Sequence, residues 1–231
     1  MADLYKFEID RDGLHRQLGA GIPKGSIALL EGKYGAGKSA ILQRLAYGFL
    51  KNGVTVTYIS TELTAKGFIE QMRSLDYPIT PYLLNKDLLY IPVFPLIGEA
   101  KPRGGFLDLL MDTKELYERE VTIIDAFSSL VKADLRGQRA IQVLAFFKKL
   151  AGLNRTVMLS CDPVDLDEKT LAPLRSDSDI YMSITMGSIE GSTVRALNVN
   201  RFGSSVEPVG DAIGFRIEPK IGFIIDITTV A

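Results

Sequence analysis

The first two-thirds of the chain alternates short apolar runs with longer segments in which apolar residues recur at helical spacing. The apolar runs are rich in β-branched and aliphatic residues and predict strands at 27–30, 55–60, 88–94, 121–125 and 156–161. The amphipathic segments between them predict helices at 40–51, 65–75, 106–118 and 140–151, with Thr64 as the N-cap of the second. A short strand at 4–9, a short helix at 11–18 and another at 165–174 complete this pattern.

From residue 179 onward the period changes to that of strands alone. Runs at 180–186, 193–199, 212–217 and 223–230 are separated by Gly and Pro turns, with no long helix between them. Strands that alternate with helices favour a parallel sheet covered on both faces. We therefore expect an α/β fold with a mostly parallel sheet, extended at one edge by antiparallel terminal strands. Neither a linker nor a repeat divides the chain, so residues 1–231 are predicted to form a single domain.

Two prolines and a loop refine this picture. Pro92 and Pro95 indicate either that the strand at 88–94 lies at an edge of the sheet or that it ends there, because proline cannot donate to a central ladder. The segment 96–105 is rich in Gly, Pro, Lys and Arg and is the best candidate for a mobile segment.

A glycine-rich loop connects the first long apolar run to the first long helix. It fits the pattern G-x-x-x-x-G-K-[ST] and consists of Gly32, Lys33, Tyr34, Gly35, Ala36, Gly37, Lys38 and Ser39, with Ala40 beginning the helix. Glycines let backbone N–H groups approach a phosphate chain closely. We expect Lys38 to reach the β- and γ-phosphates and Ser39 to bind Mg²⁺, whereas Lys33 and Tyr34 point outward. The pattern predicts a site for a purine nucleoside triphosphate.

Polar residues at the ends of other strands are candidates for the rest of this site. Asp125 ends a strand and is the candidate second Mg²⁺ ligand; alternatively, it caps the next helix. Glu62 follows the strand at 55–60 and is the candidate general base, because the carboxyl ends of parallel strands meet at one crevice. The alternative for Glu62 is a carboxylate favoured by the helix dipole. Ser160 is either a sensor of the γ-phosphate or a buried polar group that pairs with the backbone.

Arg201 is a further candidate, just past the strand at 193–199. An arginine supplied by a neighbouring subunit often stabilises the transition state of phosphoryl transfer. The alternative interpretation is a solvated arginine in a turn.

Composition limits the classes of function that remain. The 27 Lys and Arg residues nearly balance the 28 Asp and Glu residues, which argues against non-specific nucleic-acid binding as the main role. Cys161 and His15 are the only residues of their types, so an intrachain disulfide and a Cys or His metal cluster are excluded. The start of the chain is charged, unlike a signal peptide, and no apolar run approaches the ~18 residues of a membrane span.

Several stretches resemble a known family. The sequence LGAGIPKGSIALLEGKYGAGKS at 18–39 resembles the KaiC-type branch of the RecA superfamily. Further stretches are similar to the accessory ATPases of the archaellum, the archaeal flagellum: VTYISTEL at 56–63, SLDY at 74–77, LLYIPVFPLI at 88–97, AFFKKL at 145–150 and FRIEPKIG at 215–222.

This resemblance implies a RecA-like P-loop fold and a cytoplasmic protein at the membrane-associated base of the archaellum motor. It implies a ring, expected to be a hexamer, that binds the motor ATPase FlaI and the scaffold FlaX and reaches the membrane only through them. Members of the family bind ATP with weak or absent hydrolysis, so the resemblance implies that bound nucleotide acts as an assembly switch.

The chain departs from the KaiC pattern at two places. KaiC-type ATPases carry two adjacent glutamates where this chain has Glu62 and Leu63, and Asn198 and Asn200 stand where basic residues are expected, unless Arg201 is their equivalent. Three interpretations therefore remain: a nucleotide-gated assembly protein, a turnover ATPase of the motor, and a RecA-like DNA-repair module.

Overall fold

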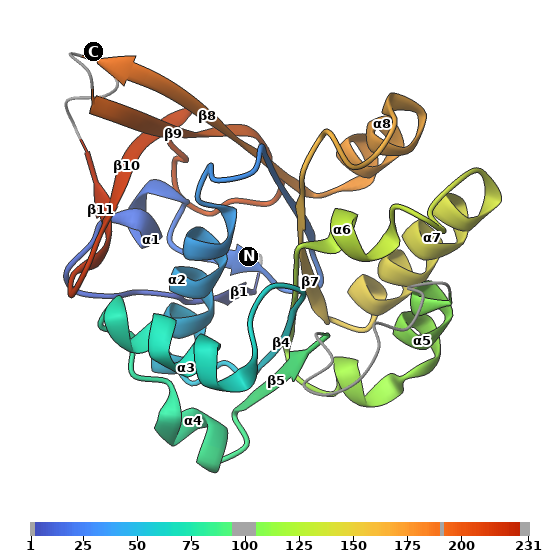
Figure 1. Cartoon of the computed structure of the whole chain (residues 1–231), viewed down its shortest axis with the longest axis horizontal. Coiled ribbons are helices and arrows are strands. Elements are labelled where there is room, and N and C mark those ends of the chain that lie inside the picture. The colour runs from blue at the N-terminus through green and yellow to red at the C-terminus, as the bar shows by residue number, and fades with distance from the viewer. Residues whose placement is uncertain (1–2, 94–104, 190–191, 227–231) are drawn as a thin grey trace.

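The computed structural model describes residues 3–93, 105–189 and 192–226. A nine-stranded sheet in the order β11-β10-β9-β8-β3-β7-β6-β4-β5 runs through its centre, with helices on both faces (Figure 1). Except for Gly105, the segment predicted to be mobile lies outside the described residues. The prediction of a single domain stays a prediction.

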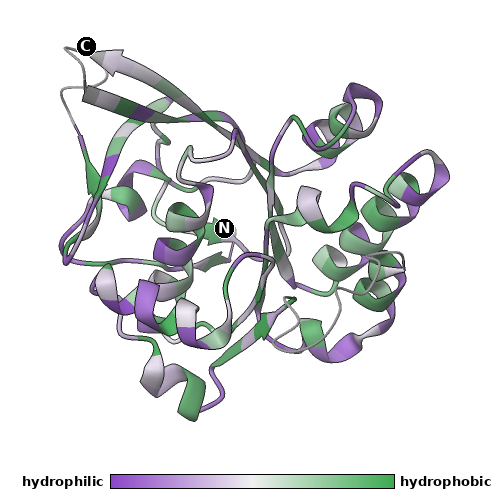
Figure 2. Ribbon diagram, in the orientation of Figure 1, coloured by the Kyte–Doolittle hydropathy of each residue, from purple (hydrophilic) through white to green (hydrophobic). Residues whose placement is uncertain are grey.

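Five parallel strands form the middle and one edge of the sheet, as the apolar runs predict. They are β3 (Ile27–Gly32), β4 (Val56–Ser60), β5 (Leu88–Pro92), β6 (Val121–Asp125) and β7 (Thr156–Cys161). In β3, Ala28 and Leu30 belong to the core cluster on one face, whereas Ile27 and Leu29 belong to that on the other. Burial on both faces explains why these strands read as continuous apolar runs (Figure 2). The edge position of β5, which ends at Pro92, confirms the argument from proline.

Helices fall into two groups, one on each face of the sheet (Figure 1). One face carries α2 (Lys38–Lys51), α3 (Ala65–Ser74) and α4 (Thr80–Leu84). The other carries α5 (Phe106–Asp112), the 3₁₀ helix η1 (Lys114–Tyr117), α6 (Phe127–Val131), α7 (Gln138–Gly152) and α8 (Glu168–Asp177). Thr64 caps α3 as predicted, since its hydroxyl accepts from the N–H of Gly67 at 3.1 Å. In the described part of the chain, no helix combines the length and the apolar character that crossing a membrane requires.

Several helices differ from the prediction, and α6 lies where the sequence predicts no helix. The helix predicted at 106–118 is interrupted at Thr113, whose backbone is extended, and continues as η1. This break buries Tyr117, whose hydroxyl donates to the carbonyl of Leu110 at 2.8 Å. Helix α4 was not predicted; Pro81 lies in its first turn, where proline costs no hydrogen bond.

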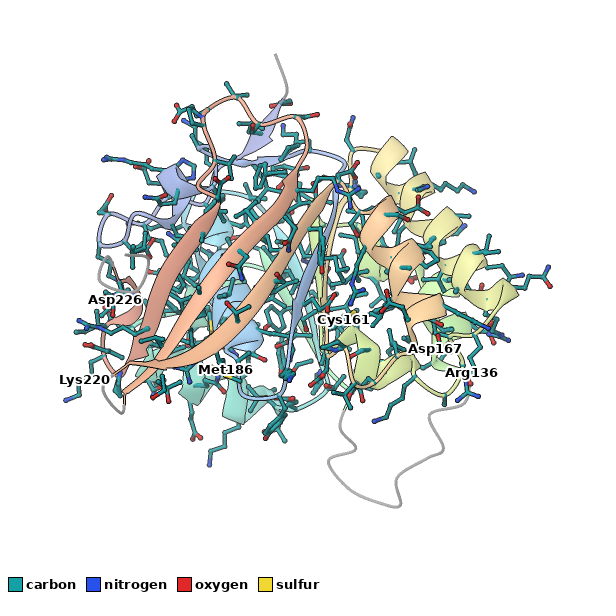
Figure 3. The ribbon with its side chains drawn as sticks, turned by 90° about the horizontal axis from the view of Figure 1, so that it is seen from above. Arg136, Cys161, Asp167, Met186, Lys220 and Asp226 are labelled. Atoms are coloured by element: carbon teal, nitrogen blue, oxygen red, sulfur yellow. The ribbon has the colours of Figure 1, made fainter. Side chains whose placement is uncertain are left out.

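The last four strands extend the sheet beyond β3. They are β8 (Ile180–Ile189), β9 (Ser192–Phe202), β10 (Ala212–Glu218) and β11 (Gly222–Ile225). The expected antiparallel arrangement holds for β9, β10 and β11, but β8 runs parallel to β3. Helix α8 returns the chain to the starting edge before β8, so β8 has the direction of the strands before it. Seen from above, Met186, Lys220 and Asp226 lie across the molecule from Asp167 at the start of α8 (Figure 3).

The N-terminal segment is tied to α2 by a buried ion pair. The predicted strand and helix shrink to β1 (Leu4–Tyr5), which pairs with β2 (Ile22–Pro23), and α1 (Leu14–Gln17). Between β1 and α1, Asp12 accepts two hydrogen bonds from Arg44, one of them from Nε at 2.9 Å. Arg44 also donates to the carbonyl of Phe7 at 2.6 Å, and the side chains of Asp12 and Arg44 are both 0% exposed. These bonds hold the segment between β1 and α1 in place where a longer strand or helix was expected.

Replacing Asp12 by Ala should destabilise the fold strongly, because the Arg44 guanidinium would stay buried without its partner. We expect a loss of about 3–5 kcal/mol in the free energy of unfolding, measured by chemical denaturation. The matched control is Asp10→Ala, which removes an exposed ion pair with Lys51 and should change stability little. Equal effects of the two substitutions would contradict this role of the buried pair.

Candidate functional site

The glycine-rich loop forms a tight bend between β3 and α2. Gly35 and Gly37 have positive φ angles of 75° and 103°, and a Cβ at Gly37 would lie 3.3 Å from the Phe215 ring. Gly37 is also the N-cap of α2 and has no side chain, so the first N–H groups of α2 are left for another acceptor. Such a helix start attracts phosphate groups.

Lys38 folds back over this loop. Its side chain is buried, and Nζ donates to the carbonyls of Gly32 at 2.6 Å and Lys33 at 3.1 Å. The ammonium group is therefore held inside the bend, where it adds a positive charge to that of the helix start. Tyr34 is 84% exposed and Lys33 is exposed, as predicted.

A pocket of about 310 Å³ opens over the loop. Its lining comes from the loop, the start of α2, the segments that follow β4, β6 and β7 (with one residue of α6), and α3: Tyr34, Gly35, Gly37, Lys38, Ser39, Ala40, Glu62, Gln71, Ala126, Ser129, Asp162 and Asp165. Most of the residues predicted to bind nucleotide thus share one pocket with the candidate base Glu62. Arg201 and Ser160 are not among the lining residues.

Asp125 lies behind the pocket wall, at the end of β6. Its side chain accepts hydrogen bonds from Ser160 Oγ at 2.8 Å and from the Tyr58 hydroxyl at 2.9 Å. Burial raises the pKa of Asp125, while hydrogen bonds from Ser160, Tyr58 and Ser39 and the charge of Lys38 oppose that rise. Ser160 is fully buried and orients this carboxylate, and its role as a sensor of the γ-phosphate stays a prediction.

The oxygen atoms of Ser39 and Asp125 are suited to Mg²⁺. Magnesium prefers oxygen ligands and is commonly held by one or two carboxylates together with phosphate oxygens and water. Within the described residues, no group of three or more His, Cys, Asp or Glu side chains could hold a metal ion alone. An Mg²⁺ ion at Ser39 and Asp125 would therefore take its other ligands from phosphate and water.

Glu62 lines the pocket just after β4 and is exposed. Partial burial raises its pKa, the charge of Asp125 adds to that rise, and Lys38 opposes it. The next residue, Leu63, packs against the hydrophobic core, and its carbonyl accepts from the Tyr90 hydroxyl at 2.7 Å. An apolar side chain packed against the core thus stands beside Glu62, at the position of the second KaiC-type glutamate.

Arg201 lies within β9 and not past its end. Its guanidinium donates to the carbonyls of Arg175 and Ser176 at the end of α8, the second at 2.7 Å. Arg175 in turn binds Glu31 through two bonds of 2.7 and 2.8 Å, next to the start of the glycine-rich loop. Within one chain, Arg201 thus stabilises α8, and its role as a trans-acting group stays a prediction.

Comparison with known proteins identifies the family. The family model "ATPase: KaiC" matches residues 10–210. The chain is 38% identical to the archaeal flagellar ATP-binding protein FlaH of Methanocaldococcus jannaschii, over 99% of this chain and 98% of that protein. The chain belongs to the FlaH family. FlaH of Methanococcus voltae is 33% identical, over 98% of both chains.

Solved structures agree with this assignment. The crystal structure of the flagellar accessory protein FlaH from M. jannaschii matches with a TM-score of 0.91 and 36% identity, over 97% of this chain and 100% of that one. The KaiC-like protein PH0186 from Pyrococcus horikoshii matches with a TM-score of 0.75 at 14% identity, over 98% and 100% of the two chains. The second likeness shows the shared KaiC-like, RecA-type fold.

Several residues that line the pocket of this FlaH-family chain are not predicted from the sequence. Asp162 follows β7, so the rule that strand ends meet at one crevice could have found it. Gln71 lies within α3, where no motif marks it. Ser129 and Asp165 likewise belong to no motif. The Glu31–Arg175 pair joins residues 144 positions apart, which no local pattern reveals.

Asp125→Asn should stabilise the FlaH-family chain at pH 7 when nucleotide and Mg²⁺ are absent, because a buried carboxylate becomes neutral. Folding raises the pKa of Asp125 above its ordinary value of 3.8. The ionised carboxylate therefore destabilises the fold fully at a pH above the folded pKa, and this destabilisation disappears as the pH falls toward 3.8. We expect Tm to rise by about 2–4 °C at pH 7, as ~1 kcal/mol produces in a chain of this size, with the gain shrinking in acid. Asp112→Asn at the exposed end of α5 is the control. A gain independent of pH would contradict this explanation.

Proposed function

We propose that this chain is an ATP-binding accessory component of the archaellum, in which bound ATP controls assembly. The main support for this proposal is that Lys38 and Ser39 line one pocket at the start of α2, while the buried Asp125 carboxylate accepts a hydrogen bond from Ser39. The names of the FlaH relatives, which describe flagellar ATP-binding proteins, support ATP binding and the association with the archaellum.

The same pocket is better equipped to hold ATP than to hydrolyse it. Glu62 is the one acid at the position of the KaiC glutamate pair, because the second position is Leu63, an apolar residue that packs against the core. The Arg201 guanidinium donates hydrogen bonds to carbonyls at the end of α8 of the same chain. Hydrolysis requires a positioned base and stabilisation of developing charge, so we infer slow or absent turnover.

ATP contacts in this pocket would join elements that are far apart in the sequence. The lining brings together the loop before α2, α3, and the residues after β6 and β7. A ligand shifts a conformational equilibrium only by binding one state more tightly, and Mg²⁺–ATP would favour the state in which these elements are closed around it. In our proposal that state forms a ring, as the family resemblance implies, with six subunits.

The proposed partners follow from the same resemblance. The ring would bind the motor ATPase FlaI and the scaffold FlaX at the cytoplasmic base of the archaellum. The near balance of charge supports a protein partner over nucleic acid.

Lys38→Ala should remove nucleotide binding and nucleotide-dependent assembly together. The loss of a buried charge that contacts phosphate should weaken ATP binding by at least about tenfold to a hundredfold, measured by titration calorimetry. Light scattering with Mg²⁺–ATP should then show the mass of the unassembled chain. The matched control is Lys33→Ala in the same loop, whose exposed side chain should matter little. A Lys38→Ala variant that assembles like wild type would contradict the switch.

A further inference from the structure

Two glutamines beside the pocket form a polar pair inside the core. Gln43 lies on α2 four residues after Ser39, on the same side of the helix, and is 0% exposed. Gln71 lies on α3 and lines the pocket. The Nε2 of Gln71 donates to Oε1 of Gln43 at 3.1 Å, so the partly buried pocket residue is held by a fully buried one.

Gln43 carries an unmet hydrogen-bond donor. Among the described residues, its Nε2 is buried and has no partner. A buried N–H group without an acceptor is costly, and such groups are rare in folded proteins. This donor therefore points to a second arrangement of the pair.

Turning both side-chain amides by half a turn gives that arrangement. Each turn exchanges the oxygen and nitrogen of one amide, so Nε2 of Gln43 would donate to Oε1 of Gln71. The Nε2 of Gln71 would then face the pocket as a donor. The buried donor of Gln43 thus gains a partner, while its Oε1 gives up the bond from Gln71, and an unpaired buried acceptor is tolerated more often than an unpaired donor. In this state Gln71 offers an N–H group to the ligand in the pocket.

The neighbours of Gln71 indicate which ligand group would accept this N–H. Gln71 shares the pocket with Lys38, Ser39 and Glu62, which belong to the phosphate end of the site. A phosphate oxygen is a strong acceptor, and hydrogen bonds to charged groups are stronger than those between neutral groups. The terminal phosphate of ATP is the group that distinguishes ATP from ADP.

We propose that Gln71, positioned by Gln43, is a specificity-determining residue that donates its amide N–H to the terminal phosphate and so favours ATP over ADP. This inference rests on the proposed function, in which the pocket binds ATP. It adds the means by which the site distinguishes the two nucleotides.

The test is the ratio of the Kd values for ADP and ATP, measured with Mg²⁺ by titration calorimetry on the whole chain. Gln71→Leu should lower the preference for ATP by about tenfold, the effect of losing one hydrogen bond to a charged group, while ADP binding stays within about twofold of wild type. Gln43→Leu should shift the ratio in the same direction, because Gln71 loses its support. Gln142→Leu, at an exposed glutamine of α7, is the matched control and should leave the ratio unchanged.

A second variant covers the case in which Gln71→Leu does not fold. Gln71→Asn keeps the amide but shortens its reach, and it should also lower the ATP preference. An unchanged ratio in the Gln71 variants, or an equal loss of ADP and ATP binding, would overturn the inference. If the wild-type chain bound neither nucleotide, the proposed function itself would fail, and the two failures are thus distinguished.

Discussion

The buried carboxylate of Asp125 joins the centre of the sheet to the start of α2. A carboxylate at this depth needs hydrogen-bond donors, and they come from three other elements: Tyr58 on β4, Ser160 on β7 and Ser39 on α2. These bonds fix the ends of three neighbouring strands against the start of α2. The pocket lies where they meet, so the geometry that satisfies one buried charge also builds the nucleotide site.

The parallel strands could be predicted because burial on both faces of the sheet makes their sequences almost continuously apolar. A strand buried on both faces, such as Ile27–Gly32, needs apolar residues at nearly every position, and the run is visible without a structure. The ends of the elements were harder. The extended backbone at Thr113 interrupts a helix and lets Tyr117 become buried. The direction of β8 depends on the edge of the sheet to which α8 returns the chain. Both are tertiary effects that local periodicity does not contain.

The candidate site likewise contains residues that the sequence predicts and residues that it does not. Lys38, Ser39, Asp125 and Glu62 were predicted because each belongs to a motif or ends a strand, and the chemistry of phosphate binding fixes their spacing. Gln43 and Gln71 belong to no motif, and the contact that gives them meaning joins two helices. Arg201 shows the converse: its sequence position suggested a free arginine, whereas the fold supplies carbonyl acceptors from α8.

If the chain binds ATP to assemble and does not need to hydrolyse it, assembly and phosphate release can be separated in a single sample. Assembly and phosphate release are followed together by light scattering and a phosphate sensor after Mg²⁺–ATP is added to the wild-type chain. We predict that assembly is complete before about one phosphate per chain is released, and that a non-hydrolysable ATP analogue gives the same mass. Assembly that required continuous phosphate release, or that failed with the analogue, would contradict the account.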